Sequence, residues 1–166
     1  MNKTTIIAII FLLTMAVFPF LVDSAWLGIG ITFLVFAVVA FSQDIILGRA
    51  GIFNMGHAIF FGIGAYTTAI LNVHFGFEII ATVPFAIILP IIISILLAGP
   101  IIHLRGDYLL VATIGFNIIF EQVLKNNVFD VTGGPSGIFG IDVVRIFGYE
   151  LYSDTAIYYI AFGLLL

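Results

Sequence analysis

The sequence lacks cysteine altogether and is poor in charged residues. Among its 166 residues, five are Lys or Arg and nine are Asp or Glu, so charged side chains amount to 8% and hydrophobic ones to 63%. Without cysteine the chain cannot form a disulfide scaffold or a cysteine-ligated zinc site, and its few scattered basic residues cannot form a nucleic-acid-binding surface. Soluble domains carry roughly 25% charged residues. The composition therefore excludes an ordinary soluble domain and predicts a protein whose apolar surface contacts the lipid bilayer.

Long uncharged runs separate the few charges. A membrane-spanning helix needs about 20 apolar residues, and a last run is still apolar when the sequence stops, after 12 residues. We predict an all-α, polytopic transmembrane helix bundle, residues 1–166, with five complete spans and a truncated sixth. The predicted spans are 4–22, 24–43, 54–73, 79–104, 107–124 and the incomplete 155–166. The incomplete run predicts that these residues are the front part of a longer chain.

The first run has two interpretations. Lys3, the apolar residues after it and the small residue Ser24 imitate a secretory signal peptide. A retained span is favoured, because further hydrophobic runs follow at once. With the N-terminus in the cytoplasm, three of the five basic residues face inward, in line with the positive-inside rule: Lys3, Arg49 and Arg105. The loop between residues 125 and 154 then faces outward.

The third run is rich in small residues. Five glycines crowd its entry and first turns: Gly48, Gly51, Gly56, Gly62 and Gly64. Broken backbone at membrane depth is tolerated only against protein or a water-filled cavity. Residues spaced by three or four share one face of the helix: Asn54, Ala58, Gly62, Ala65, Ala69 and Asn72. This face either lines a translocation path or forms a close helix–helix seam, and spacing alone favours the seam.

The fourth and fifth runs carry a different signal each. Three prolines predict a bent fourth helix: Pro84, Pro90 and Pro100.

In the fifth run, Thr113, Asn117 and Glu121 recur every four residues and form a polar stripe. An acid inside a membrane marks a pathway or a paired interior. Glu121 can equally pair with Lys125 one turn later at the interface, and the spacing fits both alternatives.

No catalytic or metal-binding constellation emerges. Gly134-Pro135-Ser136-Gly137 resembles the nucleophile motif of intramembrane serine proteases, but every histidine precedes the serine, and a turn is the better interpretation. The three histidines are too far apart in sequence for a helical metal pair: His57, His74 and His103. We expect neither a metal nor a cofactor.

Two stretches carry a more specific signal. Residues 47–66 read LGRAGIFNMGHAIFFGIGAY, and a second set comprises HLRGDY at 103–108, TIGF at 113–116 and DVTGGPSGI at 130–138. The first resembles the glycine-rich signature of branched-chain amino acid ABC transporter permeases, and the second resembles their M-type subunit. Two features depart from the usual pattern, Arg49 before Ala-Gly and Asn54-Met55 before Gly-His, and they put the substrate in doubt.

The resemblance implies a transport subunit that performs no chemistry. It would be a multi-pass protein of the bacterial inner membrane that carries leucine, isoleucine or valine, with urea or short-chain amides as the alternative substrates. Its partners would be an H-type permease subunit, two cytoplasmic ATPase subunits and an external substrate-binding protein. Members are expected to be nearly twice as long, with the segment that couples to the ATPase in their second half.

The candidate site residues fall into three groups. Those expected to line the path or its gate are Asn54, His57, Gly62, Asn117 and Glu121. Those expected to pack helices together are Ala58, Ala65 and Ala69. The outward loop, as the docking surface for the binding protein, contributes Asp130, Thr132, Gly133, Gly134 and Pro135.

Overall fold

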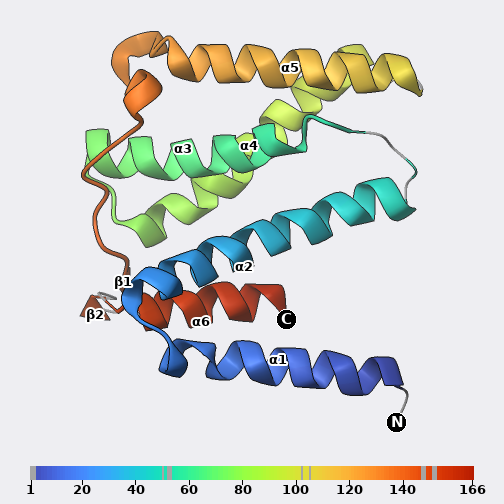
Figure 1. Cartoon of the computed structure of the whole chain (residues 1–166). Coiled ribbons are helices and arrows are strands. Elements are labelled where there is room, and N and C mark those ends of the chain that lie inside the picture. The colour runs from blue at the N-terminus through green and yellow to red at the C-terminus, as the bar shows by residue number, and fades with distance from the viewer. Residues whose placement is uncertain are drawn as a thin grey trace. The chain divides into compact units, whose positions relative to one another are not determined.

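The computed structural model describes residues 3–49, 51, 54–101, 103–104, 106–146, 149–150 and 153–166. Its helices within these residues are α1 (Lys3–Leu21), α2 (Ser24–Asp44), α3 (His57–Phe75), α4 (Ile79–Ile101), α5 (Asp107–Lys125) and α6 (Asp154–Leu165) (Figure 1). A π-helical turn, η1 (Ile45–Arg49), extends α2, and two 3₁₀ turns, η2 (Val128–Asp130) and η3 (Gly134–Ser136), follow α5. Arg105, one of the basic residues used to predict the orientation, lies outside the described residues.

Four helical segments are long and apolar enough to cross a membrane: Ser24–Arg49, His57–Phe75, Ile79–Ile101 and Asp107–Lys125. They overlap the second to fifth predicted spans. Two shorter apolar segments, Ile9–Leu21 in α1 and Asp154–Leu165, occupy the first and last predicted runs. The helices therefore confirm a multi-pass, mainly helical chain.

The described chain is all-α apart from one short hairpin that the sequence did not predict. Strands β1 (Arg145–Ile146) and β2 (Tyr149–Glu150) form an antiparallel hairpin in which Arg145 lies opposite Glu150. Each strand has two residues, too few to show the alternation of apolar and polar residues that identifies a strand in a sequence.

The helix ends have local causes. The third helix begins at His57 rather than at residue 54, because the Asn54 side chain accepts a hydrogen bond from Gly56 N (2.8 Å) and forms a turn ahead of the helix. It ends at Phe75 and is capped by Gly76, whose φ of 69° suits a residue without a Cβ and whose N–H donates to Asn72 O. The fourth helix continues through its three prolines.

The chain forms two compact units. The first comprises residues 1–42 and 151–166, and its core contains Leu27, Leu34 and Tyr158. The hydroxyl of Tyr158 donates to Met15 O at 2.8 Å, and its ring stacks on Phe18. This aromatic core joins α6 to α1 although the two helices stand at opposite ends of the sequence.

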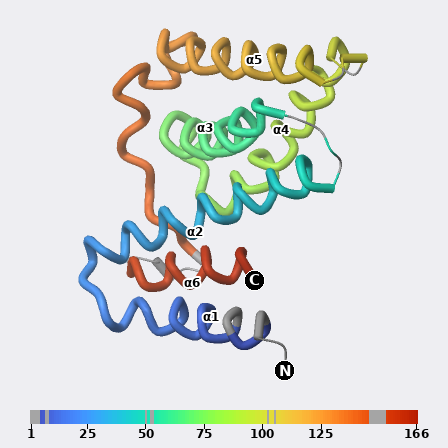
Figure 2. The backbone as a smooth tube through the Cα atoms, turned by 45° about the vertical axis from the view of Figure 1, so that its right-hand side comes forward, coloured from blue at the N-terminus to red at the C-terminus, as the bar shows by residue number. Residues whose placement is uncertain are grey.

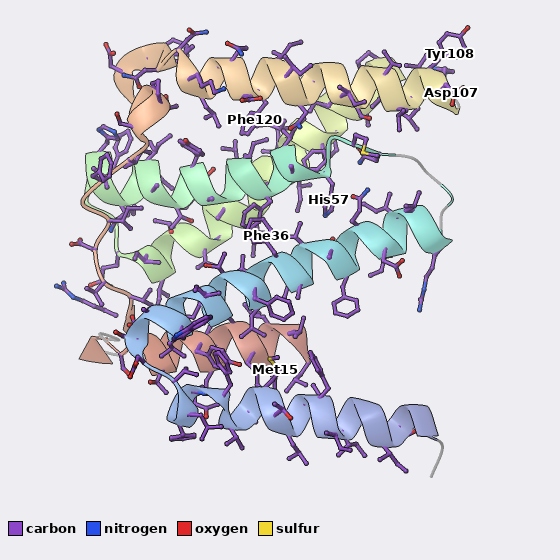
Figure 3. All side chains as sticks on the ribbon, viewed as in Figure 1. Met15, Phe36, His57, Asp107, Tyr108 and Phe120 are labelled. Atoms are coloured by element: carbon purple, nitrogen blue, oxygen red, sulfur yellow. The ribbon has the colours of Figure 1, made fainter. Side chains whose placement is uncertain are left out.

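The second unit comprises residues 43–150 and holds every candidate site residue. Here α3 lies along α4, with α5 beside them (Figure 2). Gly64 faces α4, where a Cβ at this position would be in ordinary van der Waals contact with Ala86 O at 3.4 Å. Gly62 lies against α5, since a Cβ there would come within 2.7 Å of the Phe120 ring. Figure 3 shows Phe120 pointing from α5 toward α3.

Candidate functional site

The glycine-rich entry to α3 is held by a chain of hydrogen bonds. Gln43, in the last turn of α2, donates through Nε2 to Asn54 O at 2.8 Å. Met55 N donates to Thr113 Oγ1 at 3.1 Å, and Thr113 in turn donates to Leu110 O at 2.9 Å. These bonds fix the segment before α3 against α5. They satisfy backbone groups that lie outside the regular helix, as a low-dielectric surrounding requires.

A cavity of about 280 Å³ opens beside this entry, between α3, the second half of α4 and the first half of α5. We call it the α3–α5 cavity. Its polar side chains are Asn54, Ser94 and Thr113. Its walls are otherwise mainly apolar and include Ile59, Phe60, Leu97, Ile101 and Phe116. No charged side chain occurs among the described residues that line it.

The predicted path residues do not all meet at this cavity. Asn54 lines it, and Thr113 of the polar stripe joins it there. His57 is the first residue of α3, and its Nδ1 is buried without a hydrogen-bond partner among the described residues, as is Oε1 of Gln43. Gly62 instead contacts Phe120. This contact supports a packing role for Gly62, and a place for it on the path stays a prediction.

The three residues of the polar stripe on α5 differ in their exposure. Thr113 is buried, Asn117 is half-buried and Glu121 is exposed. The Glu121 carboxylate pairs with Lys125 Nζ at 2.5 Å, and about half of each side chain remains exposed. This is the ion pair that the sequence left open as the alternative, so the role of Glu121 in a path stays a prediction.

The small residues on α3 also differ in their surroundings. Ala69 is buried, whereas Ala58 and Ala65 are exposed in the described chain. Ala65 and Ala69 line a smaller cavity of about 200 Å³ together with Ile138 and Ile141 of the outward loop. The C-terminal half of α3 therefore lies close to this loop.

The outward loop is organised by Asn127. Its Oδ1 accepts hydrogen bonds from Thr132 N and Gly133 N, both at 2.9 Å, and its Nδ2 donates to the Asp130 carboxylate at 3.2 Å. The Thr132 hydroxyl lies 2.8 Å from Leu124 O, where it caps the end of α5. Sequence reasoning missed Asn127, although an Asn two residues after the end of a helix is a common turn-forming signal.

Glycines make this loop possible. Gly133 and Gly134 have φ values of 70° and 59°, and a Cβ at Gly133 would overlap the carbonyl group of Gly137. Pro135 follows in the first turn of η3. Ser136 ends that turn and is exposed. Within the described chain it forms no hydrogen bond with a histidine, so the turn interpretation of Gly-Pro-Ser-Gly fits the structure better than a protease motif.

Two residues near the end of α3 hold the loop in place. Asn72, which is 3% exposed, accepts from Asp142 N at 2.8 Å and donates to Phe77 O at 2.8 Å. Nε2 of His74 lies 3.2 Å from Val131 O. The sequence placed Asn72 on the small-residue face but assigned it no role, because its partner lies 70 residues further along the chain.

Comparison with known proteins identifies the class. The chain belongs to the branched-chain amino acid transport system permease component family, whose sequence model matches residues 25–166. This match includes the α3–α5 cavity and the outward loop, and it confirms the family resemblance found in the sequence.

The similar relatives are M-type subunits. The chain is 36% identical over 146 residues to the high-affinity branched-chain amino acid transport system permease protein LivM of Escherichia coli (strain K12), which covers 87% of the chain and 34% of that protein. It is 34% identical over 145 residues to the LivM protein of Salmonella typhimurium (strain LT2), with the same coverage. The chain spans about a third of the length of these relatives. The expected twofold difference in length was therefore too small. No solved structure matches the chain.

Proposed function

We propose that the chain is the part of a permease subunit that builds one side of the membrane path in an ATP-driven importer of branched-chain amino acids. The observation that carries this proposal is the family match over residues 25–166, which contains the complete α3–α4–α5 unit. Leucine, isoleucine and valine are the substrates. The transporter resides in the bacterial inner membrane, and this subunit itself catalyses no reaction.

The proposal includes the partner subunits. An external binding protein delivers the amino acid to the outward loop, an H-type permease subunit supplies the other side of the path, and two cytoplasmic ATPase subunits drive the cycle. The hydrogen bonds of Asn127 and Asn72 support the docking role of the loop, because a surface fixed in one conformation binds without a large ordering cost.

We further propose that α1 and α6 cross the bilayer with the four longer helical segments. The phenol of Tyr158 on α6 finds its partner in the backbone of α1, which supports the two helices lying within one apolar layer. With the N-terminus inside, α3 and α5 begin and α4 ends on the cytoplasmic side. The α3–α5 cavity then lies in the cytoplasmic half of the membrane, and Asn54, His57, Gly62 and Asn117 follow the path outward.

Uptake of labelled leucine tests the proposal. Cells without their own branched-chain amino acid uptake would receive the natural gene that contains this chain, together with genes for its partner subunits. We expect leucine uptake that requires ATP and that unlabelled isoleucine and valine inhibit. Inhibition by urea with no effect of isoleucine would favour the alternative substrate class. Absence of leucine uptake by an assembled complex would contradict the proposal.

A further inference from the structure

We propose that the α3–α5 cavity binds one zwitterionic amino acid with an aliphatic side chain, with its carboxylate at Asn54 and its ammonium group at Ser94. The inference rests on the proposed function and gives it a site. Ser94, Phe60 and Phe116 were not among the candidate site residues, because they come from three different helices that residue spacing alone does not bring together.

The size of the cavity selects a small solute. Its volume of about 280 Å³ lies just below the roughly 300–1,000 Å³ of pockets that hold drug-sized ligands. A second cavity between α3 and α4, of about 350 Å³, is larger, and Thr67 is the one polar residue among its described lining. That second cavity suits a lipid chain, whereas the α3–α5 cavity combines apolar walls with polar side chains.

The apolar wall favours an aliphatic side chain over urea. Ile59, Leu97 and Ile101 bring aliphatic groups from two helices to one volume, and Phe60 and Phe116 add aromatic rings. Contact of a leucine or valine side chain with these walls is favourable, because it removes apolar surface from water. Urea has no apolar group to bury and gains nothing from this wall.

The polar groups suit the two charged ends of a zwitterion. Asn54 Oδ1 is held by Gly56 N, so the Nδ2 group points its two N–H donors elsewhere and forms no hydrogen bond within the described chain. An amide N–H pair is a suitable donor to a carboxylate. The Ser94 hydroxyl donates to Ile91 O at 2.7 Å, which leaves its lone pairs able to accept from an ammonium group.

Because the described lining contains no charged side chain, the cavity favours a ligand with no net charge. A zwitterion brings one charge of each sign, which attract each other and balance. A lysine or glutamate ligand would bring an additional charge into an apolar site without a counter-ion, and burial of an unpaired charge is strongly unfavourable. The site therefore accepts neutral amino acids and rejects charged ones.

Cysteine labelling tests the assignment directly, because the natural sequence of this chain contains no cysteine. Ser94→Cys places a thiol in the cavity with little change in volume, and Ala98→Cys is a second variant on the same wall. Leu96→Cys is the matched control, since Leu96 is on the same helix at nearly the same depth, 74% exposed and outside the cavity lining. Each variant is assembled with its partner subunits in nanodiscs, treated with a water-soluble thiosulfonate, and analysed by mass spectrometry of this segment.

We expect Ser94→Cys and Ala98→Cys to react and Leu96→Cys to remain unmodified, because thiosulfonates attack thiolates in water and not thiols in lipid. Leucine at ten times its half-protecting concentration should slow the cavity reactions about tenfold, while lysine, glutamate and urea should not. Leucine uptake by the unmodified complex is measured in parallel. Normal uptake without protection of either cavity variant would overturn this inference and leave the proposed function intact. Failure of uptake itself would overturn the proposed function.

Discussion

Met55 N donates a hydrogen bond to Thr113 Oγ1 at 3.1 Å, across 58 residues of sequence. This bond joins the irregular segment before α3 to the first half of α5, at the rim of the α3–α5 cavity. Thr113 also donates to Leu110 O, so one hydroxyl both caps a backbone N–H and remains bonded to its own helix. The position of Asn54 in the cavity depends on this contact.

Thr113→Val removes the hydroxyl and keeps the shape of the side chain. We expect the complex to lose about 0.5–1.5 kcal/mol of stability, because the part-buried hydrogen bond from Met55 N loses its acceptor. Thr113→Ser, which retains the hydroxyl, should lose less. Thermal unfolding of the assembled complex measures the difference, and equal melting temperatures for the Val and Ser variants would contradict the prediction.

Gly62→Ala should weaken the contact between α3 and α5. The new Cβ would come within 2.7 Å of the Phe120 ring, which must move. Such overpacking costs about 1–3 kcal/mol. Gly115→Ala on α5 is the matched control, because a Cβ there meets nothing within 4 Å. The double variant Gly62→Ala/Phe120→Leu should recover stability in a thermal-unfolding series, and strict additivity of the two substitutions would show that the residues do not interact.

The sequence predicted the membrane helices well because hydrophobic length is a local property. The bounds of α4 and α5 differ from the predicted spans by at most three residues. The start of α3 was misplaced because the turn at Asn54 depends on a side-chain hydrogen bond to Gly56 N. The hairpin β1–β2 depends on pairing between very short segments, which leaves no periodic pattern to detect.

The candidate site was harder to predict for a physical reason. A helix face can be read from residue spacing, which placed Asn54 and Thr113 among the polar residues of interest. A cavity depends on how helices pack against each other. Ser94 and Phe116 line it from two different helices, and residue spacing within one helix does not show which helices are neighbours. The same holds for Asn72, whose bond to Asp142 N closes a loop of 70 residues.

Asn127→Ala should release the outward loop. The substitution removes the oxygen that accepts hydrogen bonds from the Thr132 and Gly133 amides. These amides then lose their protection from hydrogen exchange with the solvent. A loss of about 1–3 kcal/mol predicts that these amides exchange hydrogen about 5–150 times faster. Asn127→Asp retains the acceptor oxygen and should exchange more slowly than the Ala variant. Asn126→Ala is the neighbouring control. Unchanged exchange in Asn127→Ala would mean that this side chain does not organise the loop.

Gly133→Ala tests the same loop as the docking surface for the external binding protein. Its φ of 70° is costly for any residue with a Cβ, by about 1–2 kcal/mol, and the new methyl group would also overlap the Gly137 carbonyl. Gly140→Ala is the control, because it has a similar φ of 81° but meets nothing within 4 Å. We expect Gly133→Ala to reduce the stimulation of ATP hydrolysis by the binding protein much more than Gly140→Ala does, while the basal hydrolysis rate stays the same. Both variants carry the backbone strain, but only Gly133→Ala also produces the overlap with the Gly137 carbonyl. Equal stimulation of ATP hydrolysis in the two variants would therefore show that the binding protein does not require the Gly133 turn.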